Sequence, residues 1–205
     1  MPLKLTHRRQ KPPDTPTHHQ SKPGHRAGLF AFMEVEMADY YTPTVVQETI
    51  PNADITALEQ LLLSHVFEAV PDGGGVYFSS SEGPSDLIWV SRSELTQALA
   101  ASHDKDSQVH SEIEKQLAAA NPDDAGEIEL DLAEASWEHM LQDIVRRSPT
   151  LRYITVTAAF MCSKMRADGF GGMALFITAD AVKGFSTTEF IADCLAEIAS
   201  GRESE

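Results

Sequence analysis

Two long apolar segments joined by a short polar one constrain the fold of this chain more than any other feature. Residues 153–162 (YITVTAAFMC) and 173–178 (MALFIT) flank the stretch SKMRADGFGG. Within that stretch Asp168-Gly169 is a strong reversal signal, because glycine adopts the positive φ that tight turns demand. We therefore predict an antiparallel hairpin with its turn at Asp168-Gly169, and hence a sheet that helices cover on at least one face.

The helices are predicted from their N-terminal signals and from their apolar spacing. A capping box, in which Ser or Thr is followed three residues later by Glu, occurs at residues 56–59, 91–94 and 186–189. Ser136 caps a further helix, and residues 107–120 form a weaker one. Apolar residues at helical spacing predict three buried helix faces, formed by Leu58, Leu61, Leu62, His65 and Val66, by Trp137, Met140, Leu141, Ile144 and Val145, and by Phe190, Ile191, Cys194, Leu195 and Ile198.

Shorter strands are predicted at residues 44–50, 76–81, 87–91 and 127–132, the second and third of them paired around the turn EGPS. The predicted fold class is therefore α+β, with a mostly antiparallel sheet covered by four or five amphipathic helices. The order helix, strand, turn, strand, capped helix occurs twice, which suggests a duplicated α-β-β-α unit. The alternative is that any α+β chain yields such a coincidence.

The charge distribution separates an N-terminal extension from the rest of the chain. Residues 1–36 hold six Lys or Arg and three Asp or Glu, a net of +3, which leaves about −18 of the overall −15 for residues 37–205. The extension combines Pro, His, Lys and Arg without an apolar period and is predicted to be disordered. We expect translation to start naturally at Met37, at the beginning of a single acidic domain at 37–205. Alternatively, the extension is a basic arm that binds a metal or an anionic surface.

Composition and motifs point away from several classes of protein. A surface this acidic repels nucleic acid backbones, and no apolar segment is long enough for a membrane span. The two cysteines, Cys162 and Cys194, lie in apolar segments and form no CxxC pair, so a reducing cytoplasm is the expected compartment. Neither a phosphate-binding loop nor a GxSxG motif occurs. We therefore predict no catalytic residues, no metal site and no cofactor, and lean toward a protein that is not an enzyme.

Two groups of residues are predicted to bind a partner. Glu127, Glu129 and Asp131 alternate along one strand, so their carboxylates share a face and repeat at about 6.6–6.8 Å, in the manner of a nucleic acid backbone. The alternative is a merely solvated face. Lys164, Arg166 and Phe170 form a basic, aromatic tip at the predicted hairpin turn, of a kind that inserts into a partner's groove. The alternative is that this segment is a hairpin turn and nothing more.

From YYTPTVVQETIP onward, and most clearly at LQDIVRRSPTLRYITVTAAFMCSKMRADGFGGMALFIT, the chain resembles conserved uncharacterised proteins of proteobacterial plasmids and other mobile elements. The resemblance covers about the last four fifths of the chain and implies no activity or catalytic residue. It implies a setting in which small accessory proteins act by binding host or element machinery.

The leading functional hypothesis is a non-enzymatic, acidic accessory protein that binds another protein. A sharper alternative is an inhibitor that mimics nucleic acid and occupies a partner's basic groove, as some anti-CRISPR and anti-restriction proteins do. A small enzyme is the third. In the first two cases the partner is a protein, with no direct binding of nucleic acid or membrane. The oligomeric state is not predicted.

Overall fold

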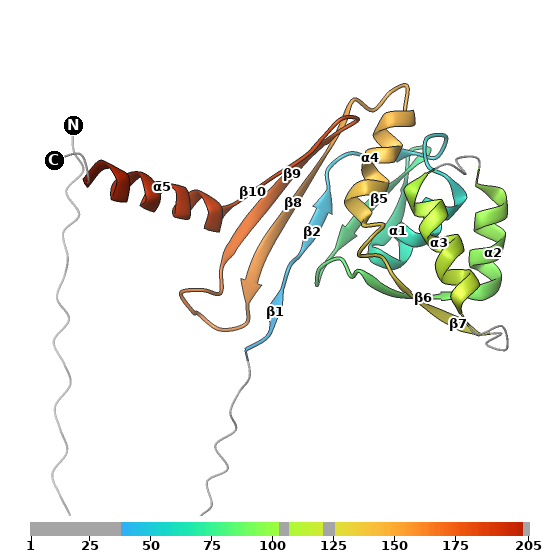
Figure 1. The fold of residues 1–205 in the computed structure, drawn as a ribbon, viewed down its shortest axis with the longest axis horizontal. Helices are drawn as coiled ribbons and strands as arrows, with labels where there is room; N and C mark the ends of the chain where they lie inside the picture. The colour runs from blue at the N-terminus through green and yellow to red at the C-terminus, as the bar shows by residue number, and fades with distance from the viewer. Residues whose placement is uncertain (1–37, 103–106, 121–125, 203–205) are drawn as a thin grey trace, which may run out of the picture. The chain divides into compact units, whose positions relative to one another are not determined.

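The computed structural model describes residues 38–102, 107–120 and 126–202, which belong to one compact unit, Met37–Glu205 (Figure 1). The prediction for residues 1–36 lies outside these described residues. The helices are α1 (Ala57–Val66), α2 (Arg92–Ala101), α3 (Gln108–Ala119), α4 (Trp137–Arg147) and α5 (Thr187–Arg202). The strands are β1 (Tyr40–Tyr41), β2 (Thr44–Val46), β3 (Ile50–Pro51), β4 (Glu68–Asp72), β5 (Gly75–Ser80), β6 (Leu87–Ser91), β7 (Glu127–Asp131), β8 (Tyr153–Cys162), β9 (Gly171–Thr178) and β10 (Val182–Ser186).

The predicted hairpin is present as β8 and β9, which pair antiparallel from Tyr153↔Thr178 to Phe160↔Gly171. These two strands belong to an antiparallel sheet in the order β10-β9-β8-β2-β5-β3. β1 also pairs with β8, and β4 also pairs with β5. The predicted α+β class with a mostly antiparallel sheet is therefore confirmed. β2 lies at its centre, between β5 and β8.

The reversal at the end of the hairpin has a different cause from the one predicted. The backbone N–H of Gly169 donates to the carbonyl of Arg166 at 3.2 Å, which closes a turn with Asp168-Gly169 in its last two positions. Gly169 does not adopt a positive φ; a Cβ there would instead lie 2.7 Å from Cβ of Cys162. Glycine is required at this position by close packing against the buried Cys162, not by a left-handed backbone.

One face of the main sheet is covered by α1 and α4, which contact β4–β5 and β8–β10 respectively. The five predicted apolar residues of α4 are all buried, as are the facing side chains Val46, Phe78, Val156 and Ile177. In α1 the buried face is rotated from the prediction, because Leu63 is buried whereas His65 is exposed. Edge-on packing of Phe67 against Trp137, with ring centroids 5.4 Å apart, joins the two helical regions.

A second, two-stranded sheet lies across α1 from the main one and corrects a predicted pairing. β6 pairs with β7, from Leu87↔Asp131 to Ser91↔Glu127, and not with β5. The hairpin partner of β5 is β4, joined to it by a turn in which Gly73 and Gly74 have φ values of 56° and 99°. Both positions are in the left-handed region that tight hairpins use, so the Asp-Gly-Gly signal there marks a hairpin.

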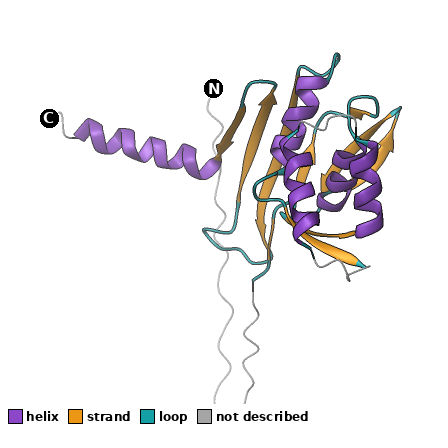
Figure 2. Ribbon diagram, turned by 45° about the vertical axis from the view of Figure 1, so that its right-hand side comes forward, coloured by secondary structure: helices purple, strands orange, loops and turns teal. Residues whose placement is uncertain are grey.

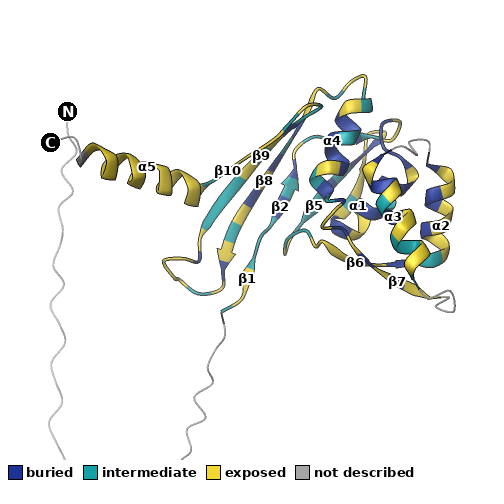
Figure 3. Ribbon diagram, viewed as in Figure 1, coloured by how far each residue is buried: buried dark blue, intermediate teal, exposed yellow. Residues whose placement is uncertain are grey.

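The largest departure from the predicted packing is at the C-terminus. α5 begins at Thr187, directly after the last residue of β10, and its main contacts are with β9 and β10. The residues Phe190, Ile191, Leu195 and Ile198, predicted to face inward, are exposed, and Cys194 is half-buried. Figure 2 shows this helix apart from the cluster formed by the others, and Figure 3 shows it exposed along its length. The helix therefore does not cover its own sheet, unlike α2, which also follows its strand directly but buries Leu95, Ala98 and Leu99.

The helix N-termini confirm two of the three predicted capping boxes. At Thr56–Glu59 and Ser186–Glu189 the side chains and backbone N–H groups bond reciprocally. Ser91 instead lies with its hydroxyl 2.8 Å from that of Ser93, and Ser136 makes no side-chain cap. The two halves of the chain each follow the order helix, three strands, helix, but β6 leaves the main sheet where β10 stays in it. The duplication stays a prediction.

Candidate partner-binding surfaces

The acidic residues predicted as a site share one exposed face of the β6–β7 sheet. Glu127, Glu129 and Asp131 are exposed, while Ile128 and Leu130 between them are buried, as the alternating pattern predicted. Each acid has a direct cross-strand neighbour on β6: Ser91, Trp89 and Leu87 respectively. Because residues paired directly across an antiparallel ladder project to the same side, the acidic row and these β6 side chains form one surface, which we call the acidic ribbon.

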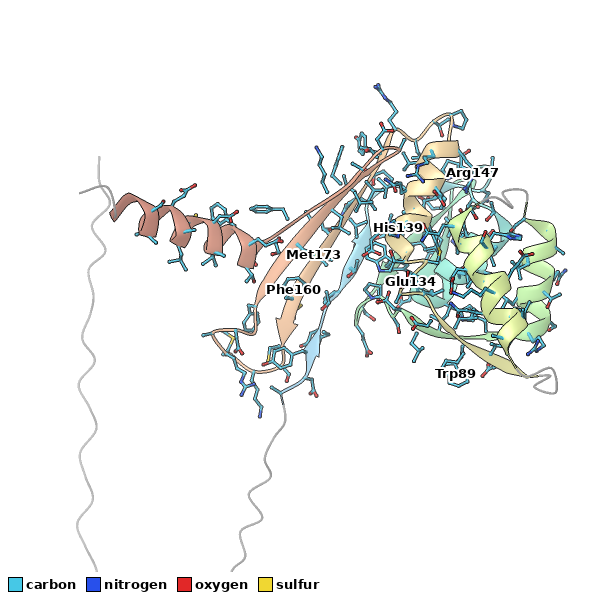
Figure 4. All side chains as sticks on the ribbon, in the orientation of Figure 1. Trp89, Glu134, His139, Arg147, Phe160 and Met173 are labelled. Atoms are coloured by element: carbon cyan, nitrogen blue, oxygen red, sulfur yellow. The ribbon has the colours of Figure 1, made fainter. Side chains whose placement is uncertain are left out.

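Sequence reasoning missed the apolar members of the acidic ribbon. Trp89 is 54% exposed and Leu87 is 51% exposed, although both are large apolar side chains. Figure 4 labels Trp89, on a strand away from the sheet that carries Phe160 and Met173. The strand LIWVS could have indicated this exposure. Ile88 and Val90 form its buried side, so Leu87 and Trp89 lie on the opposite face. Tryptophan is enriched at protein interfaces, so the exposed Trp89 marks this face as a candidate binding surface.

The edge of the acidic ribbon is held by α3. Gln116 Nε2 donates to the carbonyl of Asp131 at 2.7 Å, and the Asp131 N–H donates to Gln116 Oε1 at 3.0 Å. The Asp131 carboxylate also accepts from the Ala133 N–H at 2.9 Å, so it has a structural role as well. The Gln116 amide and Lys115 both bond Glu112, and together they lower the pKa of that carboxyl, with Gln116 the larger cause. These contacts fix the backbone from which the acidic row projects.

The second predicted group lies at the tip of the β8–β9 hairpin, in the loop 163–170. Arg166 Nη1 donates to the Tyr40 hydroxyl at 2.9 Å, which ties this loop to β1 and, with Asp168 nearby, raises the pKa of the guanidinium above its usual range. Phe170 is exposed, Lys164 is half-buried, and Met165, which the prediction omitted, is 92% exposed. The tip is thus an exposed surface, but it lies at the end of the main sheet and is not brought together with the acidic ribbon (Figure 1).

A polar cleft between α3 and α4 is a candidate active site for the alternative in which the chain is an enzyme. Its volume is about 420 Å³, and its lining includes Ser107, His139, Asp143 and Arg146. Asp143 is paired with Arg146 at 2.5 Å, and His139 Nδ1 lies 3.3 Å from the Ser136 hydroxyl. The His139 ring is exposed. A hydroxyl and an imidazole in open contact with water lack the sheltered setting in which such a pair works as nucleophile and base.

A buried ion pair near this cleft is structural. Glu59 accepts from Arg147 Nη2 at 2.5 Å and also from the backbone N–H and hydroxyl of Thr56, so one carboxylate caps α1 and ties it to the end of α4. Within the described ranges, no group of three or more His, Cys, Asp or Glu is placed to hold a metal ion, and no helix is long and apolar enough to cross a membrane.

Comparisons of the chain with protein-family models, with curated proteins and with solved structures find no match.

Proposed function

We propose that this chain is a non-enzymatic accessory protein that binds another protein through the acidic ribbon. The observation that carries the proposal is the exposure of Trp89 and Leu87 directly opposite Glu129 and Asp131 on one rigid two-stranded face. On a chain of net charge −15, acidic residues alone single out nothing. The exposed pair Trp89 and Leu87 distinguishes this face from the rest of the acidic surface, because a partner that covers both side chains removes their apolar area from water.

The chemistry of the ribbon describes its partner. An arginine or lysine of the partner can pair with Glu127 or Glu129 while its charged group lies over the face of Trp89, which adds cation–π attraction. The acidic surface as a whole attracts a basic partner over long range and speeds the encounter. We therefore propose a partner with a basic groove that has an apolar floor. The resemblance to uncharacterised proteins of plasmids and other mobile elements suggests that this partner belongs to host or element machinery.

Mimicry of nucleic acid is the second candidate, favoured by the regular spacing of the three carboxylates. It differs from the first in one measurable respect, because a mimic occupies the site that nucleic acid itself uses. Nucleic acid should then displace the chain from its partner, while the chain alone gives no shifted band with DNA or RNA at physiological salt. A partner that binds the chain and DNA at the same time supports the first candidate and excludes the second.

The proposal is tested by a pair of variants that change the same charge in different places. The first carries Glu127→Gln, Glu129→Gln and Asp131→Asn; the last of these substitutions keeps a side-chain oxygen that can accept from the Ala133 N–H. The control carries Glu82→Gln, Glu94→Gln and Glu134→Gln, three exposed acids elsewhere. With a partner captured from the native host, the first variant should associate more slowly and with a weaker dependence on salt, and the control should resemble the unchanged chain.

Tryptophan emission provides an independent measurement. The chain has two tryptophans, of which Trp137 is buried and Trp89 is exposed. Binding of the partner should shield Trp89 from acrylamide quenching, and the Trp89→Phe variant should lose that signal. Unchanged quenching on saturation with the partner, together with equal association rates for the two triple variants, would show that the ribbon is only a solvated face.

A further inference from the structure

A stripe of aromatic side chains crosses the face of the main sheet that α1 and α4 leave open. The rings of Tyr153 and Phe176 are stacked, with centroids 5.1 Å apart and an interplanar angle of 25°. Phe185 on β10 and Phe190 on α5 continue the stripe, with centroids 6.0 Å apart. The register places Phe176 opposite Thr155 and Lys183, on the same face as Phe185. These four rings are 44–56% exposed, so the stripe runs from β8 to α5 without cover.

The apolar face of α5 continues this stripe as a ridge. Ile191, Leu195 and Ile198 recur at helical spacing and are 53–62% exposed. The main contacts of α5 are with β9 and β10, at its own start, and the ridge side chains stay exposed, so the ridge is not folded onto the stripe of its own chain. Each copy of the chain therefore carries an apolar sheet face that lacks a helix and an apolar helix that lacks a sheet.

The size of this surface fits a stable interface. Aromatic side chains bury about 150–250 Å² each when fully covered, so seven half-exposed apolar side chains offer roughly 600–700 Å². A standard interface takes about 800 Å² from each partner, and the backbone and polar rim supply the remainder. A contiguous apolar surface of this extent is larger than soluble monomers usually expose.

We propose that two copies of this chain associate through this surface, with the ridge of each α5 lying across the aromatic stripe of the other. Such a contact is self-complementary, which is what a two-fold dimer requires. None of the seven side chains carries a charge, so their contact buries no acidic group. Glu189, Asp193 and Glu197 recur along α5 beside the ridge, and Lys183 beside the stripe supplies a positive charge that this acidic row can meet.

The dimer is tested by light scattering after size exclusion on the full chain alone, without any partner. We expect a mass twice the 22.5 kDa of one chain, at about 0.15 M and also at about 1 M NaCl, because apolar contact is not screened by salt. The variant with Ile191→Glu and Leu195→Glu should have the mass of one chain. Val70→Glu places a charge on an equally exposed apolar residue of β4 and should leave the mass doubled.

Hydrogen exchange provides a second measurement on the same samples. The backbone amides of α5 should be protected in the unchanged chain and in Val70→Glu, and should exchange faster in the double variant, while those of α4 stay protected in all three. A mass of one chain for the unchanged protein at both salt concentrations overturns the proposal, as does a double variant that remains a dimer. This inference goes beyond the proposed function, and either result leaves the test of the acidic ribbon intact.

Discussion

The side-chain amide of Gln116 bonds both the N–H and the carbonyl of Asp131, at 3.0 and 2.7 Å, and so takes the place of a neighbouring strand at the edge of β7. An edge strand with free backbone groups can pair with another chain. Here a helix residue occupies that edge at the point where the acidic row ends.

Replacing Gln116 by Ala should lower the free energy of unfolding by about 1 kcal/mol, since three hydrogen bonds, two to the backbone of Asp131 and one to the Glu112 carboxylate, are exchanged for bonds to water at a half-exposed site. Chemical denaturation of the two proteins measures the difference. Gln97→Ala, at an exposed position of α2, is the matched control and should change stability by less than about 0.5 kcal/mol. Equal effects at the two positions would mean that the bonds to Asp131 contribute nothing.

The same glutamine controls the titration of Glu112. Its hydrogen bond is the main cause that lowers the pKa of Glu112 below 4.5, with Lys115 a lesser one. A carboxyl with a lowered pKa in the folded state contributes stability above its unfolded pKa and loses that contribution as the pH falls through the folded value. Gln116→Ala should therefore raise the pKa of Glu112 toward 4.5, and by more than Lys115→Ala does. Carbon-detected NMR titration of the side-chain carboxyl compares the two, and the reverse order would contradict the assignment.

The ion pair between Arg147 and Glu59 should be far more sensitive to substitution than the one between Arg146 and Asp143. Arg147→Met leaves the fully buried Glu59 carboxylate without its ionic partner, and removing one member of a buried pair costs about 3–5 kcal/mol. Arg146→Met breaks a pair whose arginine is half-exposed, which is worth about 1 kcal/mol or less. Thermal and chemical unfolding measure both. Comparable losses would show that Glu59 is reached by water in solution.

Substitutions at three glycines distinguish the cost of close packing from the cost of a strained backbone. Gly169→Ala places a Cβ 2.7 Å from Cβ of Cys162 and should cost about 1–3 kcal/mol, as overpacking does. Gly73→Ala meets no atom within 4 Å but must keep a φ of 56°, which costs about 1–2 kcal/mol. Gly126→Ala, with neither constraint, is the control and should be near neutral.

Asparagine distinguishes the two causes. Because Asn tolerates the left-handed region, Gly73→Asn should recover most of the stability lost in Gly73→Ala. Gly169→Asn should be at least as unstable as Gly169→Ala, because its larger side chain meets the same obstacle. Recovery at position 169 would place the strain in the backbone, as the Asp-Gly sequence first suggested.

Local patterns predicted local structure well. The apolar spacing from Trp137 to Val145 predicted the buried face of α4 because every member of that face lies within three turns. The alternation in EIELD predicted one wet and one buried side of β7 for the same reason. The candidate acids were correctly expected on the exposed side of β7. Trp89 was overlooked as their neighbour, since that neighbourhood depends on a pairing between β6 and β7 that the chain makes across about 40 residues.

Predictions failed where a distant segment decides the outcome. β4 has no alternation and contains Pro71, yet it is a strand because β5 pairs along its whole length. The five apolar residues of α5 recur at helical spacing as those of α4 do, but burial also requires a surface to pack against, and α5 contacts only the ends of β9 and β10 closely. An amphipathic pattern indicates that one face of a helix must be covered. It does not indicate whether the same chain or another molecule covers it.

The central place of β2 has a consequence for the order of events during synthesis. β2 precedes every helix, yet one of its edges is paired by β8, and Thr155 bonds the Glu48 carboxylate across 107 residues of sequence. The Glu59 carboxylate, which caps α1, likewise bonds Arg147, which follows it by 88 residues in the sequence. A ribosome that has made the first 140 residues holds a chain whose central strand is half paired and whose first helix lacks its ionic partner. The main sheet therefore closes only when the last third of the chain emerges.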